Sequence, residues 1–188
     1  MMIDSDEVRA APNGHVSIAD PLTAAPTDVT TPLPVAWSEL GYIDQEGVTI
    51  TPGIELEDIM MWQSAAVVKQ LLKSASFEVS FTMGQINRTT TGVYFLGSTW
   101  TSNGTTAVLS VPSAPQISSN EFALCVEWDD GEGYNTRFYS GRGSIGEREA
   151  MQLSRSDVVK LGITYKVLDN SGDLVDILSN NPSLVDAS

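Results

Sequence analysis

The segment at residues 141–146 reads Gly-Arg-Gly-Ser-Ile-Gly and has the G-x-G-x-x-G spacing of a dinucleotide-binding loop. That loop works inside a parallel strand–helix–strand unit, where a helix N-terminus faces the pyrophosphate. Here the preceding strand is expected to be the second arm of a hairpin, and only 42 residues follow Gly146. Such a unit cannot be completed, so we interpret the segment as a glycine-rich bend between strands.

A second candidate is the acidic cluster at residues 127–132, whose carboxylates could bind Ca²⁺. Its spacing is not that of an EF-hand loop, and Asp-Asp-Gly is the composition of a tight turn. We therefore prefer a solvated hairpin turn. A carboxylate pair for glycoside hydrolysis stays open, because its separation is set in space, but no pair stands out.

His15 and Cys125 are the only histidine and the only cysteine. A Ser-His-Asp or Cys-His site would have to use His15, which lies in a segment expected to be flexible and therefore poor for catalysis. A structural zinc site would need carboxylates for its other ligands. We expect no cofactor, no metal and no enzymatic activity.

The charge distribution argues against nucleic-acid recognition. The formal net charge is −14, with five acids and one base in residues 1–36 and four acids and no base in residues 169–188. Binding to phosphates requires clustered Lys and Arg. The first residues lack the pattern of a secretory signal, and the apolar runs are too short to span a bilayer. We expect cytoplasmic synthesis and no membrane-spanning segment.

Proline content and periodicity divide the chain into three regions. Residues 1–36 hold five of the nine prolines and are expected to form an extended, flexible acidic arm. Residues 37–168 are expected to form one β domain, and residues 169–188 an acidic C-terminal tail.

Apolar residues alternate with polar ones through much of the central region, which predicts strands. Asn103-Gly104 predicts a hairpin, residues 74–76 a link between two paired strands, and residues 87–97 a short helix closed by a glycine. The fold class is therefore mainly β, an antiparallel sandwich or barrel with one short flanking α-helix. The expected strands are residues 48–51 (ending at a Pro52-Gly53 turn), 66–73, 77–83, 105–111, 121–128, 134–140, 147–153 and 159–167.

Residues 52–64 are expected to be a long connection that carries exposed apolar side chains. Exposed apolar residues in a loop usually need a partner surface, which could be the chain's own core or a neighbouring subunit. The residues concerned are Ile59, Met60, Met61 and Trp62.

Three blocks of sequence carry a family resemblance. They are residues 40–42 with 46–52, 57–59 and 62–65; residues 77–82 with 85–90; and residues 123–131 with 141–143 and 156–157. In order and spacing they resemble the tail tube proteins of siphophages, particularly those of actinobacterial hosts.

The resemblance implies a structural virion protein of the tail, assembled in the bacterial cytoplasm. Six copies would close into a ring, and rings would stack into a hollow tube that delivers the genome, with DNA passing through unrecognised. Expected partners are the tape measure, tail terminator and distal tail proteins. The connection at residues 52–64 would contact the adjacent ring. Acids on strands that could line the lumen are Glu78, Glu121, Glu127, Glu147 and Glu149.

Two alternatives remain open from sequence. One is another ring-forming virion component, such as a head–tail joining or tail terminator protein. The other is a carbohydrate-binding β-sandwich that uses its tryptophans as stacking platforms, although Trp128 falls on an apolar strand face and is expected in the core. The four tryptophans are Trp37, Trp62, Trp100 and Trp128.

Overall fold

The computed structural model describes residues 8–116 and 120–185. It is mainly β and antiparallel, with one short helix, which confirms the predicted fold class. The principal sheet has the order β2-β1-β7-β8-β9-β4-β3, with β10 also paired to β8, and a separate pair is formed by β5 and β6. The strands are β1 Asn13–Ala19, β2 Ser38–Glu39, β3 Ile43–Met60, β4 Val67–Met83, β5 Thr99–Ser102, β6 Ala107–Ser110, β7 Glu121–Asp129, β8 Asn135–Arg148, β9 Leu161–Val167 and β10 Asp176–Ser179.

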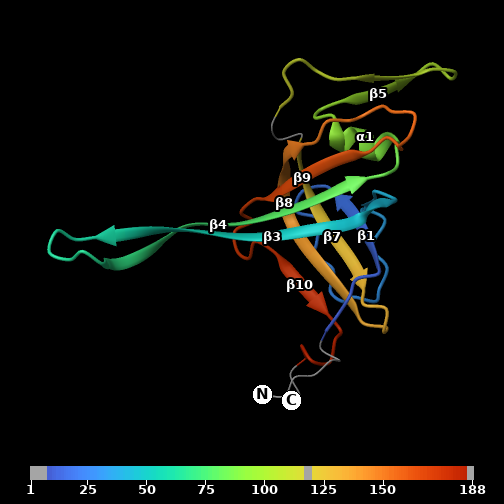
Figure 1. Cartoon of the computed structure of the whole chain (residues 1–188). Helices are drawn as coiled ribbons and strands as arrows, with labels where there is room; N and C mark the ends of the chain where they lie inside the picture. Colours follow the sequence, from blue (N-terminus) through green and yellow to red (C-terminus); the bar gives the residue numbers. More distant parts are fainter. Residues whose placement is uncertain (1–7, 117–119, 186–188) are drawn as a thin grey trace.

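The sheet folds over, so that β1 and β7 lie across β4 and β3 around one core (Figure 1). Alternating apolar residues make this possible, because each strand turns one face inward. The core includes Val126 of β7, Val79 and Phe81 of β4, and Tyr165 of β9, all nearly inaccessible to solvent. Burial of each such side chain contributes roughly 1.5–3 kcal/mol.

The helix α1, Arg88–Tyr94, packs against this core through Tyr94. Asn87 caps it: the side-chain oxygen of Asn87 accepts from the backbone N–H of Thr90, and the Thr90 hydroxyl accepts from the N–H of Asn87. This capping box offsets the poor helix propensity of the threonines. The predicted helix is confirmed, but Phe95 caps its C-terminus in place of the predicted glycine. The predicted Asn103-Gly104 hairpin, between β5 and β6, is also confirmed.

The expectation of a flexible N-terminal arm is wrong for the part of residues 1–36 that the structure describes. Residues Asn13–Ala19 form β1, which pairs along its whole length with β7. Residues 20–36, here called the strap, cross the outer face of β7 and β8. Leu33 of the strap and the adjoining Trp37 pack with Tyr139 in a second, smaller core. The prolines favour an extended strap, and its contacts with the sheet hold it in place.

The C-terminal tail also departs from expectation, because Asp176–Ser179 form β10 against β8. The strand expected at residues 147–153 is wrong beyond residue 148, where β8 ends. Instead β8 continues through residues 141–146, so these residues do not separate two strands. Register shifts interrupt the pairing of this segment with β7 and with β9. Its glycines allow close packing: a Cβ on Gly143 would lie 2.6 Å from the backbone oxygen of Lys166 and against the Tyr165 ring.

Candidate assembly surfaces

The most prominent surface is a long β-hairpin formed by the outer halves of β3 and β4, residues 53–76. The predicted turn at Pro52-Gly53 and the predicted link at residues 74–76 are wrong, because β3 and β4 continue through these positions. The loop predicted at 52–64 is wrong as far as residue 60, where β3 ends, and residues 61–64 lie in the hairpin turn. Pro52 is tolerated because β3 is an edge strand. Figure 1 shows the hairpin projecting far beyond the folded body.

The cross-strand register assigns side chains to the two faces of the hairpin. One face is largely apolar and continues the face that carries Val79 in the core: it bears Ile54, Leu56 with Leu72, and Met60 with Val67. Asp58 and Gln70, joined by a hydrogen bond of 2.8 Å, interrupt it between Leu56 and Met60. A bulge places both Lys73 and Ser74 opposite Glu55 on the other face, where Lys73 Nζ lies 2.7 Å from Glu55 Oε1. The apolar face therefore extends outward without a covering layer.

The hairpin tip is apolar and exposed. Trp62 is 100% exposed, and the turn is closed by a hydrogen bond of 3.0 Å from Ser64 N–H to the Met61 carbonyl. Of the four predicted contact residues, the structure brings Ile59 to the end of β3, where it is partly buried, and leaves the other three exposed. The exposed large apolar residues of the hairpin are Ile54, Leu56, Met60, Met61, Trp62, Val67, Val68, Leu71 and Leu72.

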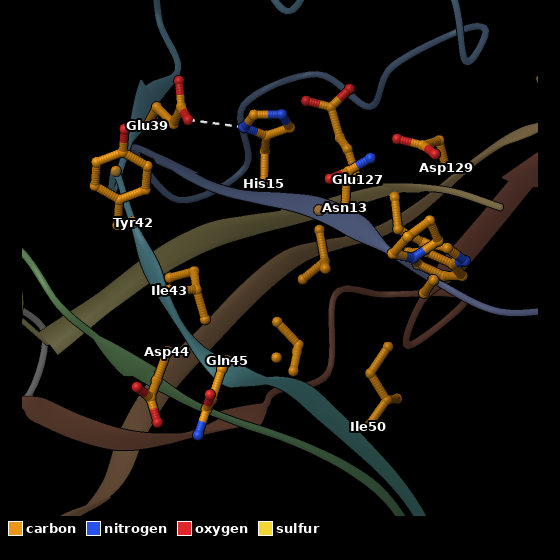
Figure 2. Close-up of a pocket in the computed structure, with 18 of the residues that line it drawn as sticks. Asn13, His15, Glu39, Tyr42, Ile43, Asp44, Gln45, Ile50, Glu127 and Asp129 are labelled. Atoms are coloured by element: carbon orange, nitrogen blue, oxygen red, sulfur yellow. Dashed lines mark hydrogen bonds and ion pairs between the residues drawn. The ribbon is translucent and has the colours of Figure 1, made fainter. Parts of the chain in front are cut away.

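A hollow of about 1090 Å³ opens between the two edges of the sheet, where β1 and β3 fail to pair. Figure 2 shows Asn13 and His15 on one side and Ile43, Asp44 and Gln45 on the other. Strand β2 covers β1 only at Ser17 and Ile18, so part of the β1 edge is open. We call this cavity the edge hollow.

The outer face of β8, β9, β4 and β3 is polar. One cross-strand row runs through Glu121, Ser144, Lys166, Glu78 and Thr51. The next row runs through Glu147, Thr164, Ser80 and Thr49, and the hydroxyls of Ser80 and Thr164 lie 3.0 Å apart. We call this surface the hydroxyl face.

The five predicted lumen acids do not share one environment. Glu78 lies 3.1 Å from Lys166 Nζ, and this hydrogen bond raises the pKa of Lys166. The guanidinium of Arg142 hydrogen-bonds Glu121 and lowers its pKa. Glu147 and Glu149 are exposed, with Glu149 just beyond β8. Glu127 lies apart from the others, under the strap, in an ion pair with Arg137.

The residues considered for catalysis or metal binding have structural roles in this fold. Asp129 and Asp130 accept backbone N–H bonds that close the β7–β8 turn, as predicted for that turn. His15 Nδ1 lies 2.9 Å from Glu39 Oε1 at the surface. Burial raises the pKa of the Cys125 thiol to about 12. Within residues 8–116 and 120–185, no group of three or more His, Cys, Asp or Glu residues is arranged to hold a metal.

The tryptophans do not form a common platform. Trp37 is buried against Tyr139, Trp128 packs against the main core, and Trp100 donates a hydrogen bond of 2.9 Å to the Thr91 hydroxyl. Only Trp62 of the four is fully exposed, and it lies at the tip of the long hairpin.

Comparison with known families decides the class of protein. The family described as "Phage tail tube protein" matches residues 1–186. The chain belongs to this family. It is thus a structural component of a phage tail, and its family assembles into a tube. The comparison with curated proteins gives no significant match. In the described part of this tail tube protein, no helix is long and apolar enough to cross a membrane.

The sequence identified Met60, Met61 and Trp62 as exposed apolar residues, but not the hairpin itself, the strap or the edge hollow. No acid occurs in residues 59–77, but that composition alone does not specify a hairpin. The strap and the hollow depend on pairing between distant segments, which leaves no local pattern.

Proposed function

We propose that six copies of this chain close into a ring and that rings stack into the hollow tail tube of a siphophage from an actinobacterial host. The tube conducts the genome during delivery. The observation that carries the proposal is the projecting hairpin, whose tip leaves Trp62 fully exposed. Contiguous exposed apolar surface of this kind marks a protein–protein contact, and here it belongs to a family of tube-forming proteins.

The hairpin tip is the proposed contact with the adjacent ring, through Ile59, Met60, Met61 and Trp62. It projects beyond the body and so can reach past the subunit's own boundary (Figure 1). Free sheet edges outside the edge hollow, such as those of the two-stranded β5–β6 sheet, support lateral closure, since an unpaired edge is stable when a neighbour pairs with it or covers it. A contact between two different surfaces, repeated with rotation, closes a ring.

The hydroxyl face is proposed to line the bore, with Glu78, Glu121 and Glu147 as its acids. Lys166 and Arg142 neutralise two of these three acids, so the face holds one uncompensated negative charge per subunit. Such a surface neither binds phosphates nor repels them strongly, which suits DNA that passes without recognition. A tube reconstruction with these three acids outside the bore would contradict this orientation.

Assembly is proposed to occur in the host cytoplasm, with the tape measure, tail terminator and distal tail proteins as partners. Negative-stain electron microscopy of concentrated wild-type protein tests the central proposal. We expect tubes whose end-on views average with sixfold symmetry. Single rings that never stack would instead support a head–tail joining or terminator role, and a monomer at all concentrations would refute ring formation.

A further inference from the structure

We propose that the edge hollow of one subunit receives the hairpin tip of another subunit of the same chain. This inference rests on the proposed function, because it names where the stacking hairpin binds. It identifies the two halves of one repeated contact, the tip at residues 60–68 and the hollow between β1, β3 and β7.

The tip cannot fill the hollow of its own subunit. Strand β3 has 18 residues, so it spans roughly 60 Å at about 3.3 Å per residue. The hollow is lined by the first residues of β3, Ile43 to Ile50, and the tip lies at the other end of the same strand (Figure 1). A rigid strand holds the two apart, so they can meet only between different copies.

The hollow offers an apolar floor to an apolar tip. Val126 is 3% exposed, and Val48, Ile50 and Trp128 are partly buried around it. These side chains belong to the main core and also line the hollow. Its volume of about 1090 Å³ lies at the upper end of the range for sites that bury a drug-sized ligand. It is therefore large enough for several side chains, such as one Trp and two Met.

Charged residues beside the tip and on the rim also favour binding of the tip in the hollow. The rim carries four acids: Glu39, Asp44, Glu127 and Asp129. Asp44 pairs with Lys160, and Glu127 pairs with Arg137. Within the described part of the chain, Glu39 and Asp129 have no basic partner other than His15, which contacts Glu39. Of the two lysines near the tip, Lys73 already pairs with Glu55, and Lys69 lies opposite Ile59 at the base of the tip. Glu57 and Asp58 lie on the same hairpin, so the charge match depends on Lys69 alone. Lys69 forms no salt bridge among the described residues.

Opposite charges at the edge of an apolar contact favour the correct partner and orientation. The joint is also heterologous: a tip on one copy enters a hollow on the next, whose own tip remains free. Repetition of such a joint produces an extended assembly rather than a closed dimer. The proposal thus accounts for both exposed features with a single contact.

Cysteine cross-linking tests the joint. The native Cys125 is fully buried, so introduced cysteines react selectively. Gln63 at the tip and Gln45 at the hollow are both exposed. Tubes of the Gln45→Cys/Gln63→Cys variant, treated with a short bis-maleimide, should give a ladder of covalent multimers. The matched control replaces Gln45→Cys by Thr101→Cys, an exposed position on β5, and should give no more product than Gln63→Cys alone.

A second measurement blocks the hollow before assembly. Monomer of the Gln45→Cys variant labelled with a bulky maleimide should fail to form tubes, and labelled Thr101→Cys monomer should form them normally. Tubes with no ladder above the control, or normal tubes from the labelled Gln45→Cys variant, would overturn the docking site while leaving the proposed function intact. Wild-type protein that never assembles would instead refute the proposed function, and the docking site with it.

Discussion

The guanidinium of Arg137 on β8 lies 2.6 Å from the Glu127 carboxylate on β7, and its side chain is only 5% exposed. The same guanidinium donates to the carbonyls of Asp28 and Thr31 in the strap. One buried cation therefore holds two sheet strands and the strap together.

Replacement of Arg137 should lower the stability of the subunit. We expect Arg137→Ala to lower the free energy of unfolding by about 3–5 kcal/mol, because it leaves a partly buried carboxylate and two carbonyls without their donor. Arg142→Ala is the matched control: it breaks an ion pair in which the arginine is 41% exposed, and should cost about 0–1 kcal/mol. Urea denaturation of the monomers measures both, and equal losses would contradict the bridging role.

The glycines of β8 should differ in their tolerance of a methyl group. Gly143→Ala would place Cβ 2.6 Å from the Lys166 carbonyl oxygen and against the Tyr165 ring, so we expect a loss of about 1–3 kcal/mol. Gly146→Ala meets only the flexible Lys166 side chain and should lose less. Thermal unfolding compares the two, and a harmless Gly143→Ala would show that packing does not explain this glycine.

The strap should be sensitive to acid. Backbone N–H bonds from Thr31 and Thr30 hold the pKa of Asp28 well below its usual range. A carboxyl with a depressed folded-state pKa stabilises the fold above its unfolded pKa of about 3.9, and that contribution is lost as pH falls through the folded value.

Asp28→Ala should accordingly melt below wild type at pH 6, and the gap should narrow as the pH falls below about 4. The control is Asp173→Ala, which removes an exposed acid and should match wild type throughout. Melting temperatures from pH 6 to 3 provide the test. A gap of constant size would show that ionisation of Asp28 does not contribute.

Local patterns predicted much of the sheet. Strands β7 and β9 were located to within two residues, as was the Asp-Asp-Gly turn between β7 and β8. Only β9 alternates strictly, because β7 is buried on both faces at residues 123–126. Where prediction failed, a distant contact outweighed a local signal. Pro52-Gly53 resembles a turn but lies on an edge strand, and the glycines at 141–146 resemble a bend but accommodate Tyr165.

Some features of the candidate surfaces follow from local sequence, and others depend on distant contacts. Residues 59–62 were identifiable because apolar side chains in a predicted loop have no local explanation. The length of the hairpin, by contrast, depends on the pairing of residues 53–60 with 67–76, which alternation alone does not specify. The proline-rich strap resembled a disordered arm because its stabilising groups, Arg137 and Tyr139, lie more than 100 residues away.

The central claim is that the hairpin tip drives tube assembly, and Trp62→Ala tests it most directly. Electron microscopy should show tubes from wild type and from Leu153→Ala, an exposed apolar control outside the hairpin. Trp62→Ala should give a monomer with an unchanged unfolding midpoint and no tubes, because its side chain contributes to assembly and not to the subunit core. Normal tubes from Trp62→Ala would contradict the account.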